Sequence, residues 1–193
     1  MTARPRSIQP RGARRFALAL RAGLGALLAL AGGSTVRAAP TVTEAQVRAA
    51  FIFHFTQFVD WPPKAFAEPG APFVIGVFGD KPIDEALTAL IRGERFGTHP
   101  FEVRRLRRAA EASSCQIVYV SNEAENLFRP AWLRGYPVLL VGETEDFLRS
   151  GGMIEFFTDH NEERFRINLN AAHASSLDIS AKLLRVAQVL PSP

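Results

Sequence analysis

The sequence predicts an α/β protein: a three-layer sandwich with a mainly parallel sheet and an antiparallel hairpin at its edge. Short apolar runs alternate with segments whose apolar residues recur every three or four positions. Strands that are continuously apolar are typical of parallel sheets covered on both faces. Two later runs flank a short polar turn, which indicates a hairpin. With 193 residues, 47% of them hydrophobic, the chain can form one domain with a substantial core.

The first 38 residues have the composition of an export signal. They contain seven arginines and no acidic residue, and an uncharged block rich in Leu and Ala at 22–36 leads to small residues before Ala38. This block is shorter than the roughly 20 residues that a membrane-spanning helix needs. We therefore predict a signal peptide over 1–38, cleaved after Ala38, and a single mature domain over 39–193. Two consecutive arginines leave the twin-arginine route open beside ordinary secretion.

The net charge of +4 belongs to this leader. Residues 39–193 contain 16 basic and 19 acidic residues, a net charge of −3. Nucleic-acid binding needs a clustered positive field. The sequence therefore argues against a nucleic-acid partner.

The first element of the mature domain is a predicted helix from about Glu44 to Asp60. Thr43 and Gln46 have the spacing of a capping box, which satisfies free backbone donors at a helix start. The helix is expected to end before Trp61-Pro62, because a proline disfavours helical geometry in the residue before it. Its apolar stripe consists of Val47, Phe51, Ile52, Phe55, Phe58 and Val59.

The remaining elements follow from the same signals. Apolar runs predict strands at 73–78, 101–106, 116–120 and 138–141. Helical spacing and caps predict helices at 82–92 and 122–133, a short one ending at Arg149, and C-terminal helices at 170–176 and 180–190. The hairpin is predicted from Met153–Phe157 and Arg164–Leu169, across Asp159-His160-Asn161.

The sequence offers no positive signal for catalysis, a metal or a cofactor. Gly79-Asp80 makes a strand-to-helix turn, but neither a dinucleotide-binding nor a phosphate-loop motif is present, and there is no nucleophile elbow. The four histidines (54, 99, 160 and 173) do not share the spacing of zinc ligands. We therefore expect no catalytic residue, no metal site and no cofactor.

Cys115 is the one cysteine, so an intramolecular disulfide is excluded. It precedes an apolar strand, and we expect a buried thiol. The one basic cluster, at 104–108, could contact an anion, but Glu102 and Glu111 nearby favour a solvated strand end.

Five segments occur in an order that is more specific than any of them alone. They are 49–62, which ends in Asp60-Trp61-Pro62; 73–82; 103–106 followed by 115–121; 151–154 with 165–172; and 180–187. Together they resemble the YfiR family of periplasmic regulators, over nearly all of residues 44–190.

The resemblance implies a non-catalytic repressor in the periplasm. Its partner would be the periplasmic part of a YfiN-like inner-membrane diguanylate cyclase, whose cyclic-di-GMP synthesis and biofilm output it would hold down. A YfiB-like lipoprotein, related to OmpA and anchored in the outer membrane, could sequester it, and family members can dimerise. Well-known members carry cysteine pairs. Here only Cys115 is present, so redox control by an internal disulfide is excluded.

The predicted partner surface combines the outer face of the hairpin with the C-terminal helix. Strand alternation places Phe157, Arg164 and Arg166 as candidates, and aromatic and Arg residues dominate interface hot spots. Two alternatives stay open. One is a small-ligand or envelope-interaction module with a cleft near Gly79-Asp80 and Ser121-Asn122, at the strand ends. The other is a hydrolase whose nucleophile and base converge in space.

Overall fold

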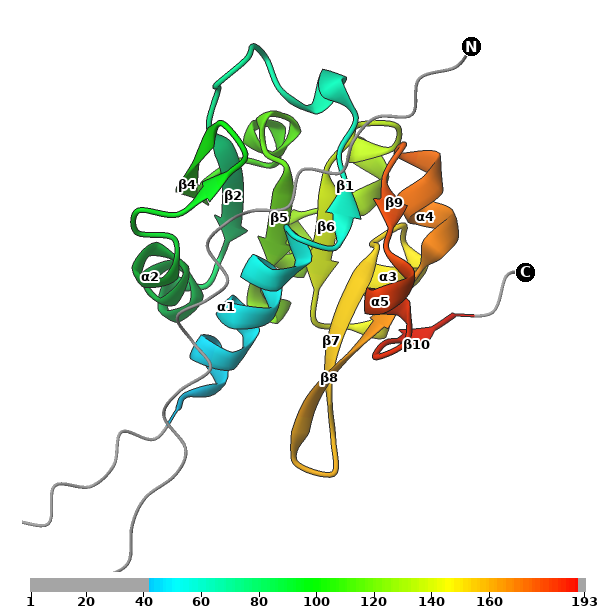
Figure 1. Cartoon of the computed structure of the whole chain (residues 1–193). Coiled ribbons are helices and arrows are strands. Elements are labelled where there is room, and N and C mark those ends of the chain that lie inside the picture. Colours follow the sequence, from blue (N-terminus) through cyan, green and yellow to red (C-terminus); the bar gives the residue numbers. More distant parts are fainter. Residues whose placement is uncertain (1–41, 191–193) are drawn as a thin grey trace, which may run out of the picture. The chain divides into compact units, whose positions relative to one another are not determined.

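A mixed eight-stranded sheet forms the centre of residues 42–190, the part of the chain that this computed structural model describes (Figure 1). The strand order is β10-β8-β7-β6-β5-β2-β4-β3, and β1 and β9 form a separate antiparallel pair. The strands are β1 Val59–Asp60, β2 Phe73–Phe78, β3 Arg95–Phe96, β4 His99–Leu106, β5 Ile117–Val120, β6 Leu139–Gly142, β7 Ile154–Asp159, β8 Glu162–Ile167, β9 Asp178–Ile179 and β10 Gln188–Val189. The predicted signal peptide lies outside the described residues.

Most strand pairs are parallel, which confirms the α/β sandwich that the sequence predicts. β4, β2, β5, β6 and β7 run parallel side by side. β7 and β8 form the expected antiparallel hairpin. The sequence pattern does not predict the two outermost strands: β3 pairs antiparallel with β4, and β10 pairs parallel with β8 over two residues. β10 therefore covers part of the outer edge of the hairpin.

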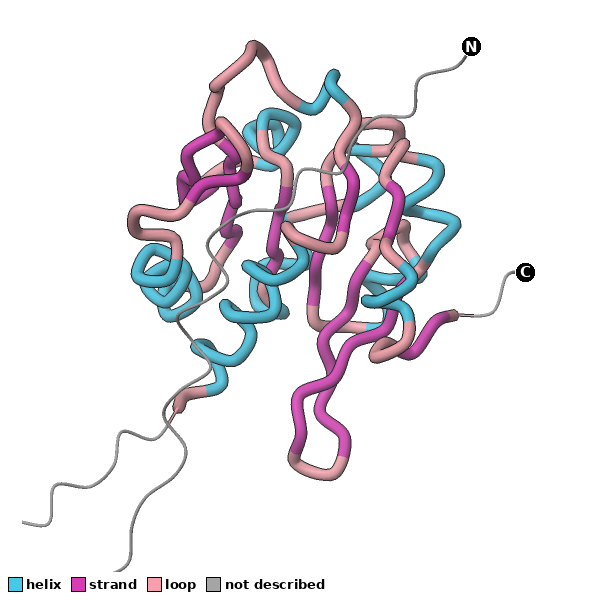
Figure 2. Tube along the Cα trace, in the orientation of Figure 1, coloured by secondary structure: helices cyan, strands magenta, loops and turns pink. Residues whose placement is uncertain are grey.

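Helices cover the sheet on both faces (Figure 2). They are α1 Glu44–Phe55, α2 Lys81–Leu90, α3 Glu145–Arg149, α4 Leu169–Ala174 and α5 Ala181–Leu184, with 3₁₀ segments η1 Pro63–Ala65, η2 Ala109–Ser114, η3 Asn122–Leu127 and η4 Pro130–Leu133. α1 and α2 pack against each other on one face. The connection from β2 to β4 moves one way along the sheet, and those from β4 to β7 move the other way. Right-handed crossovers therefore place η2, η3, η4 and α3 on the opposite face.

α1 begins as predicted but ends earlier. The Thr43 hydroxyl accepts from the Gln46 backbone at 3.2 Å, and the Gln46 side chain accepts from the Thr43 backbone at 2.9 Å. This reciprocal capping box fixes the helix start. The predicted continuation to Asp60 is wrong, because the chain turns after Phe55 and its next two-residue strand, β1, pairs with β9.

Two other predicted helices are interrupted or short. Segment 122–133 forms η3 and η4, which are separated by an extended Arg129. The cause is Pro130, since a proline disfavours helical geometry in the preceding residue. Segment 180–190 contains only the four residues of α5 before the chain extends into β10. The pairing of β10 with β8 replaces the predicted helix there.

Phenylalanine rings connect α1 to the hairpin. The ring centre of Phe55 lies 5.9 Å from that of Phe156 and 5.2 Å from that of Phe165. Phe51 contacts the same two rings. Phe156 and Phe165 are cross-strand partners, so both belong to one face of the hairpin. α1 therefore covers this inner face with aromatic contacts at favourable separations.

The β7–β8 hairpin extends beyond the strands on either side (Figure 1). β6 pairs with it only as far as Glu155, and β10 pairs only with Arg166 and Ile167. His160 and Asn161 form the turn with φ values of 49° and 64°, the left-handed pair that a two-residue type I′ turn requires. Among the described residues, the outer half of the hairpin therefore pairs with no strand other than the two that form it.

Candidate functional site

The three residues predicted to contact a partner share the outer face of the hairpin. Phe157 is the cross-strand partner of Arg164, and Glu155 is that of Arg166. Successive side chains in a strand point to opposite faces, and the phenylalanines between these residues face α1. The four side chains therefore point away from α1. Their contact with a partner stays a prediction.

Arg166 holds this face together. Its guanidinium donates to Glu155 at 3.0 Å and to the Gln188 side chain of β10 at 2.8 Å. Its Cζ lies 4.0 Å from the centre of the Phe157 ring, a cation–π geometry. Arg166 therefore ties the C-terminal strand to the hairpin, a structural role that alternation alone does not predict.

Glu155 depends on this arginine. The residue is 3% exposed, and its Oε2 atom has no hydrogen-bond partner among the described residues. Burial raises the pKa of Glu155, and the positive charge of Arg166 opposes that rise. A buried carboxylate with a single charged partner is strongly destabilising once that partner is removed.

Arg164 has more exposed and weaker contacts. Its guanidinium lies 3.2 Å from Glu162 and 3.6 Å from Asp159, and both acids are themselves exposed or half-exposed. Exposed ion pairs of this kind contribute little to stability. Arg164 can therefore exchange these contacts for others at small cost, beside the aromatic ring of Phe157.

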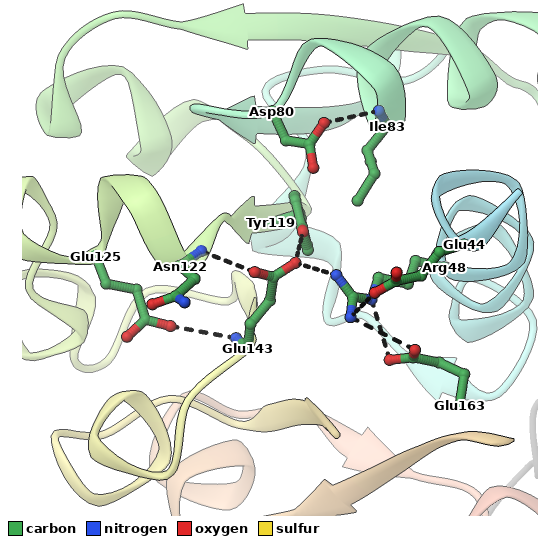
Figure 3. A network of polar contacts seen from close by, with 9 residues as sticks. All are labelled: Glu44, Arg48, Asp80, Ile83, Tyr119, Asn122, Glu125, Glu143 and Glu163. Carbon is green, nitrogen blue, oxygen red and sulfur yellow. Dashed lines mark hydrogen bonds and ion pairs between the residues drawn. The ribbon is translucent and has the colours of Figure 1, made fainter. Parts of the chain in front are cut away.

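A second arginine lies on the inner face, in a network that the sequence does not predict (Figure 3). Arg48 of α1 donates to Glu163 of β8 at 3.0 Å and to Glu143 after β6, and it also pairs with Glu44. The Tyr119 hydroxyl donates to the same Glu143 carboxylate. No local sequence motif predicts this cluster, because Arg48 and Glu163 are 115 residues apart in the sequence.

The network continues along the carboxyl ends of β5 and β6. Glu143 accepts from the Asn122 backbone at 2.9 Å, and Glu125 accepts from the Glu143 backbone at 3.2 Å. Burial lowers the pKa of Arg48, but the hydrogen bond to Glu163 and the charges of Glu143 and Glu163 outweigh it, so the pKa is raised. Arg48 is thus a fixed positive charge that neutralises this acidic edge and ties α1 to the sheet.

The strand ends where the small-ligand alternative places a cleft are tightly packed beside Gly79. This glycine has φ 102°, and a Cβ atom added to it would lie 2.4 Å from the Ser121 hydroxyl oxygen and 2.6 Å from the Ala124 Cβ. Asp80 caps α2 by accepting from the Ile83 backbone at 3.0 Å. The turn at Gly79-Asp80 therefore packs tightly against Ser121 and Ala124.

Two surface hollows lie elsewhere. One of about 630 Å³ lies between η4, the end of α3 and α4, and its lining includes Arg134, Met153 and Asn168. The other, of about 450 Å³, lies between η2 and η4 beside Trp132 and Tyr136. Neither hollow includes the outer face of the hairpin or the Arg48 network.

The histidines, the acidic residues and Cys115 remain as candidates for metal or thiol chemistry. Within residues 42–190, no group of three or more His, Cys, Asp or Glu side chains is placed to hold a metal ion. Cys115 is buried, as expected. Burial raises the pKa of its thiol to about 11. The thiol is therefore protonated and unreactive at neutral pH.

Several residues of the segments that suggested a family have structural roles. Trp61 packs edge-on against Phe73, with ring centres 4.9 Å apart, and donates to the Gln116 carbonyl at 3.3 Å. The Gln116 side chain accepts from the backbone of β2 at 2.6 Å. Asn168 caps α4 by accepting from the Ala171 backbone at 3.1 Å. These residues of the recognisable sequence pattern thus stabilise the fold.

Over residues 42–190, no helix combines the length and the apolar character that crossing a membrane requires. No curated protein matches the chain. The protein family described as YfiR/HmsC-like matches residues 45–188, from α1 to the start of β10. The chain therefore belongs to the YfiR/HmsC-like family, as the order of its segments indicated.

Proposed function

We propose that the protein is a non-catalytic repressor that binds the periplasmic part of a YfiN-like inner-membrane diguanylate cyclase and lowers cyclic-di-GMP synthesis. The observation that carries this proposal is the family match over residues 45–188. Membership supports, in general, a periplasmic regulatory role in cyclic-di-GMP signalling. The cyclase partner, the cleaved signal peptide over 1–38 and release by a YfiB-like lipoprotein are the specific parts of the proposal. A homodimer is proposed on the same basis.

The outer face of the hairpin is the proposed contact surface for the cyclase. It presents the half-buried Phe157 ring beside the exposed Arg164. An aromatic ring flanked by arginine is the composition that most often carries interface energy. The ion pairs of Arg164 are exposed and easily exchanged, so a partner carboxylate could replace them.

The first experiment tests regulation and export together. Cyclic-di-GMP is measured in a strain that lacks the gene, and the strain is complemented with the full-length chain or with residues 39–193 alone. We expect cyclic-di-GMP to rise in the deletion strain and to return to its original level only with the full-length chain. An unchanged level in the deletion strain would contradict repression of a cyclase, and rescue by residues 39–193 would contradict action outside the cytoplasm.

The second experiment tests the surface. Arg164→Glu is compared with Arg92→Glu, a matched change at another exposed arginine, just after α2. Both variants should keep the wild-type melting temperature, and Arg164→Glu alone should weaken repression, because it places a negative charge beside Phe157. Equal repression by the two variants would remove the outer face of the hairpin from the proposal.

A small-ligand module is the second candidate function. The observation that favours it is the hollow of about 630 Å³ between η4, α3 and α4, a volume within the range of ligand pockets. If the deletion strain shows no change in cyclic-di-GMP, a thermal-shift screen of small metabolites is the next measurement. A ligand-dependent rise in melting temperature, abolished by Met153→Trp, would support this alternative.

A further inference from the structure

Exposed apolar side chains gather in one short stretch of the chain. Leu127, Trp132 and Tyr136 are 64%, 57% and 48% exposed, and they lie within ten residues of one another around η4. Single exposed apolar residues are ordinary on a protein surface. Two of them, Trp132 and Tyr136, line one hollow, and exposed aromatic side chains that gather in this way mark a surface that meets something less polar than water.

This stretch is basic although the domain is acidic. Residues 126–142 contain no Asp or Glu, and Arg129 and Arg134 are exposed among the apolar residues. Among residues 42–190, neither guanidinium forms an ion pair. By contrast, residues 39–193 as a whole carry a net charge of −3. The positive charge is therefore local, which favours a negatively charged occupant.

The neighbouring segment η2 extends the same surface. Ala109, Ala110 and Ser113 of η2 face Trp132 and Tyr136 across the hollow of about 450 Å³. Arg107 and Arg108, which directly precede η2, are both exposed, although Arg108 pairs with Glu111 at 3.0 Å. The aromatic rings thus lie beside a hollow between η2 and η4, and each of these two segments is flanked by exposed arginines.

The composition and the extent of this surface favour a lipid membrane over a protein. The exposed parts of Leu127, Trp132 and Tyr136 amount to roughly 350 Å², judged from about 150–250 Å² for a whole aromatic side chain. A stable protein interface needs about 800 Å² from each partner. Trp and Tyr are the residues enriched at membrane–water interfaces, and arginines beside them attract anionic headgroups.

We propose that segment 127–136, together with Arg107 and Arg108, docks the domain on an anionic lipid membrane. Trp132 and Tyr136 insert at the level of the headgroups, and the arginines contact lipid phosphates. The contact is peripheral and reversible. It is distinct from the proposed cyclase surface, because η2 and η4 form it and not the β7–β8 hairpin, although both surfaces lie on the sheet face opposite α1.

The test measures binding to vesicles. It uses residues 39–193, because the described residues 42–190 contain a continuous hydrophobic core. We expect co-sedimentation with vesicles of phosphatidylglycerol mixed with phosphatidylethanolamine, little with phosphatidylcholine vesicles, and loss of binding when salt is raised from about 0.05 M to about 0.5 M. Trp132 fluorescence should shift to shorter wavelength on the anionic vesicles, as judged by subtracting the spectrum of the Trp132→Phe variant.

Matched variants decide whether the surface is the right one. Trp132→Ser with Tyr136→Ser, and separately Arg129→Gln with Arg134→Gln, should each weaken binding at least about tenfold. Val186→Ser and Arg185→Gln, at exposed positions near the C-terminus, should bind as the wild type does. Because all these side chains are exposed, the melting temperatures should stay unchanged.

Three results would overturn the proposal. They are no binding to anionic vesicles, equal binding by the 127–136 variants and the wild type, and binding to soluble polyglutamate that requires Trp132 and Tyr136 while vesicles are not bound. The last result would assign the surface to an acidic protein instead.

Discussion

The two faces of the β7–β8 hairpin each centre on an arginine, but the surroundings of these arginines differ. Arg48 lies on the inner face with a side chain 16% exposed, and its partners Glu143 and Glu163 are 13% and 8% exposed. Arg166 lies on the outer face and is 29% exposed, with one buried partner, Glu155. The inner arginine is enclosed by several elements. The outer arginine lies beside β10, the two-residue strand at the edge of the sheet.

This difference indicates which face of the hairpin stabilises the fold and which face is available to a partner. Breaking an enclosed charge network lowers the stability of the fold strongly, because each remaining carboxylate loses its counter-charge where it is poorly solvated. A network at the edge can rearrange locally. We therefore expect stability to depend on the inner face, and regulation to depend on the outer face and above all on Arg164, whose contacts are the most exposed of the three arginines.

The largest expected effect is that of Arg48→Ala. It leaves Glu143 and Glu163 without their counter-charge, and the free energy of unfolding should fall by about 3–5 kcal/mol. Urea denaturation measures the change. As a control, the double variant Arg48→Met with Glu163→Gln removes charge from both partners and should recover part of the loss. A fall of less than about 1 kcal/mol in the single variant would mean that the inner network is no tighter than a surface ion pair.

Arg166→Ala should have an intermediate effect. The change leaves Glu155 buried without its one charged partner, and we expect a loss of about 2 kcal/mol. Gln188→Ala removes only the exposed amide contact of the same guanidinium and should cost under about 1 kcal/mol. If the two variants unfold at the same denaturant concentration, the Glu155 pair does not govern this edge.

Glu155→Gln should change how stability depends on pH. Burial holds the pKa of Glu155 above the ordinary glutamate value of 4.5 in the folded protein. The folded state therefore binds this proton more tightly than the unfolded state does, and stability falls as pH rises from about 4.5 through the folded pKa. The glutamine variant should lose this decline, as measured by melting temperatures between about pH 4 and 7. The exposed change Glu85→Gln, in α2, should keep this decline.

The smallest effect on stability should come from Arg164→Ala. Its two ion pairs are exposed, so the free energy of unfolding should change by less than about 1 kcal/mol. Repression of cyclic-di-GMP synthesis should nevertheless weaken, if the outer face meets the cyclase as proposed. A variant that loses stability and repression together would indicate that Arg164 belongs to the structural network and not to the partner surface.

Local sequence signals predict the six inner strands of the sheet and the face of the hairpin. β2 has the predicted bounds, because a continuous apolar run between a proline and a glycine strongly favours a buried strand. The outward direction of Phe157 and Arg164 follows from alternation across a two-residue turn. The capping box of Thr43 was equally readable. These features depend on neighbours a few residues away.

Features that depend on distant partners were not predicted. The strands β1, β9 and β10 have two residues each, and each exists because another segment offers its backbone. The Arg48 network likewise joins residues from α1, β5, the segment just after β6, and β8. The spacing of residues along the chain does not reveal such clusters. The candidate partner surface could therefore be proposed from the sequence, whereas the Arg48 network on the inner face of the hairpin could not.

The contact between α1 and the hairpin also dictates an order of events during synthesis. Arg48 must wait for Glu163, made 115 residues later, and the phenylalanines of α1 wait for Phe156 and Phe165 of the same hairpin. Contacts of such long sequence separation form late in folding. The packing of α1 against the hairpin can therefore be completed only after most of the chain has been synthesised.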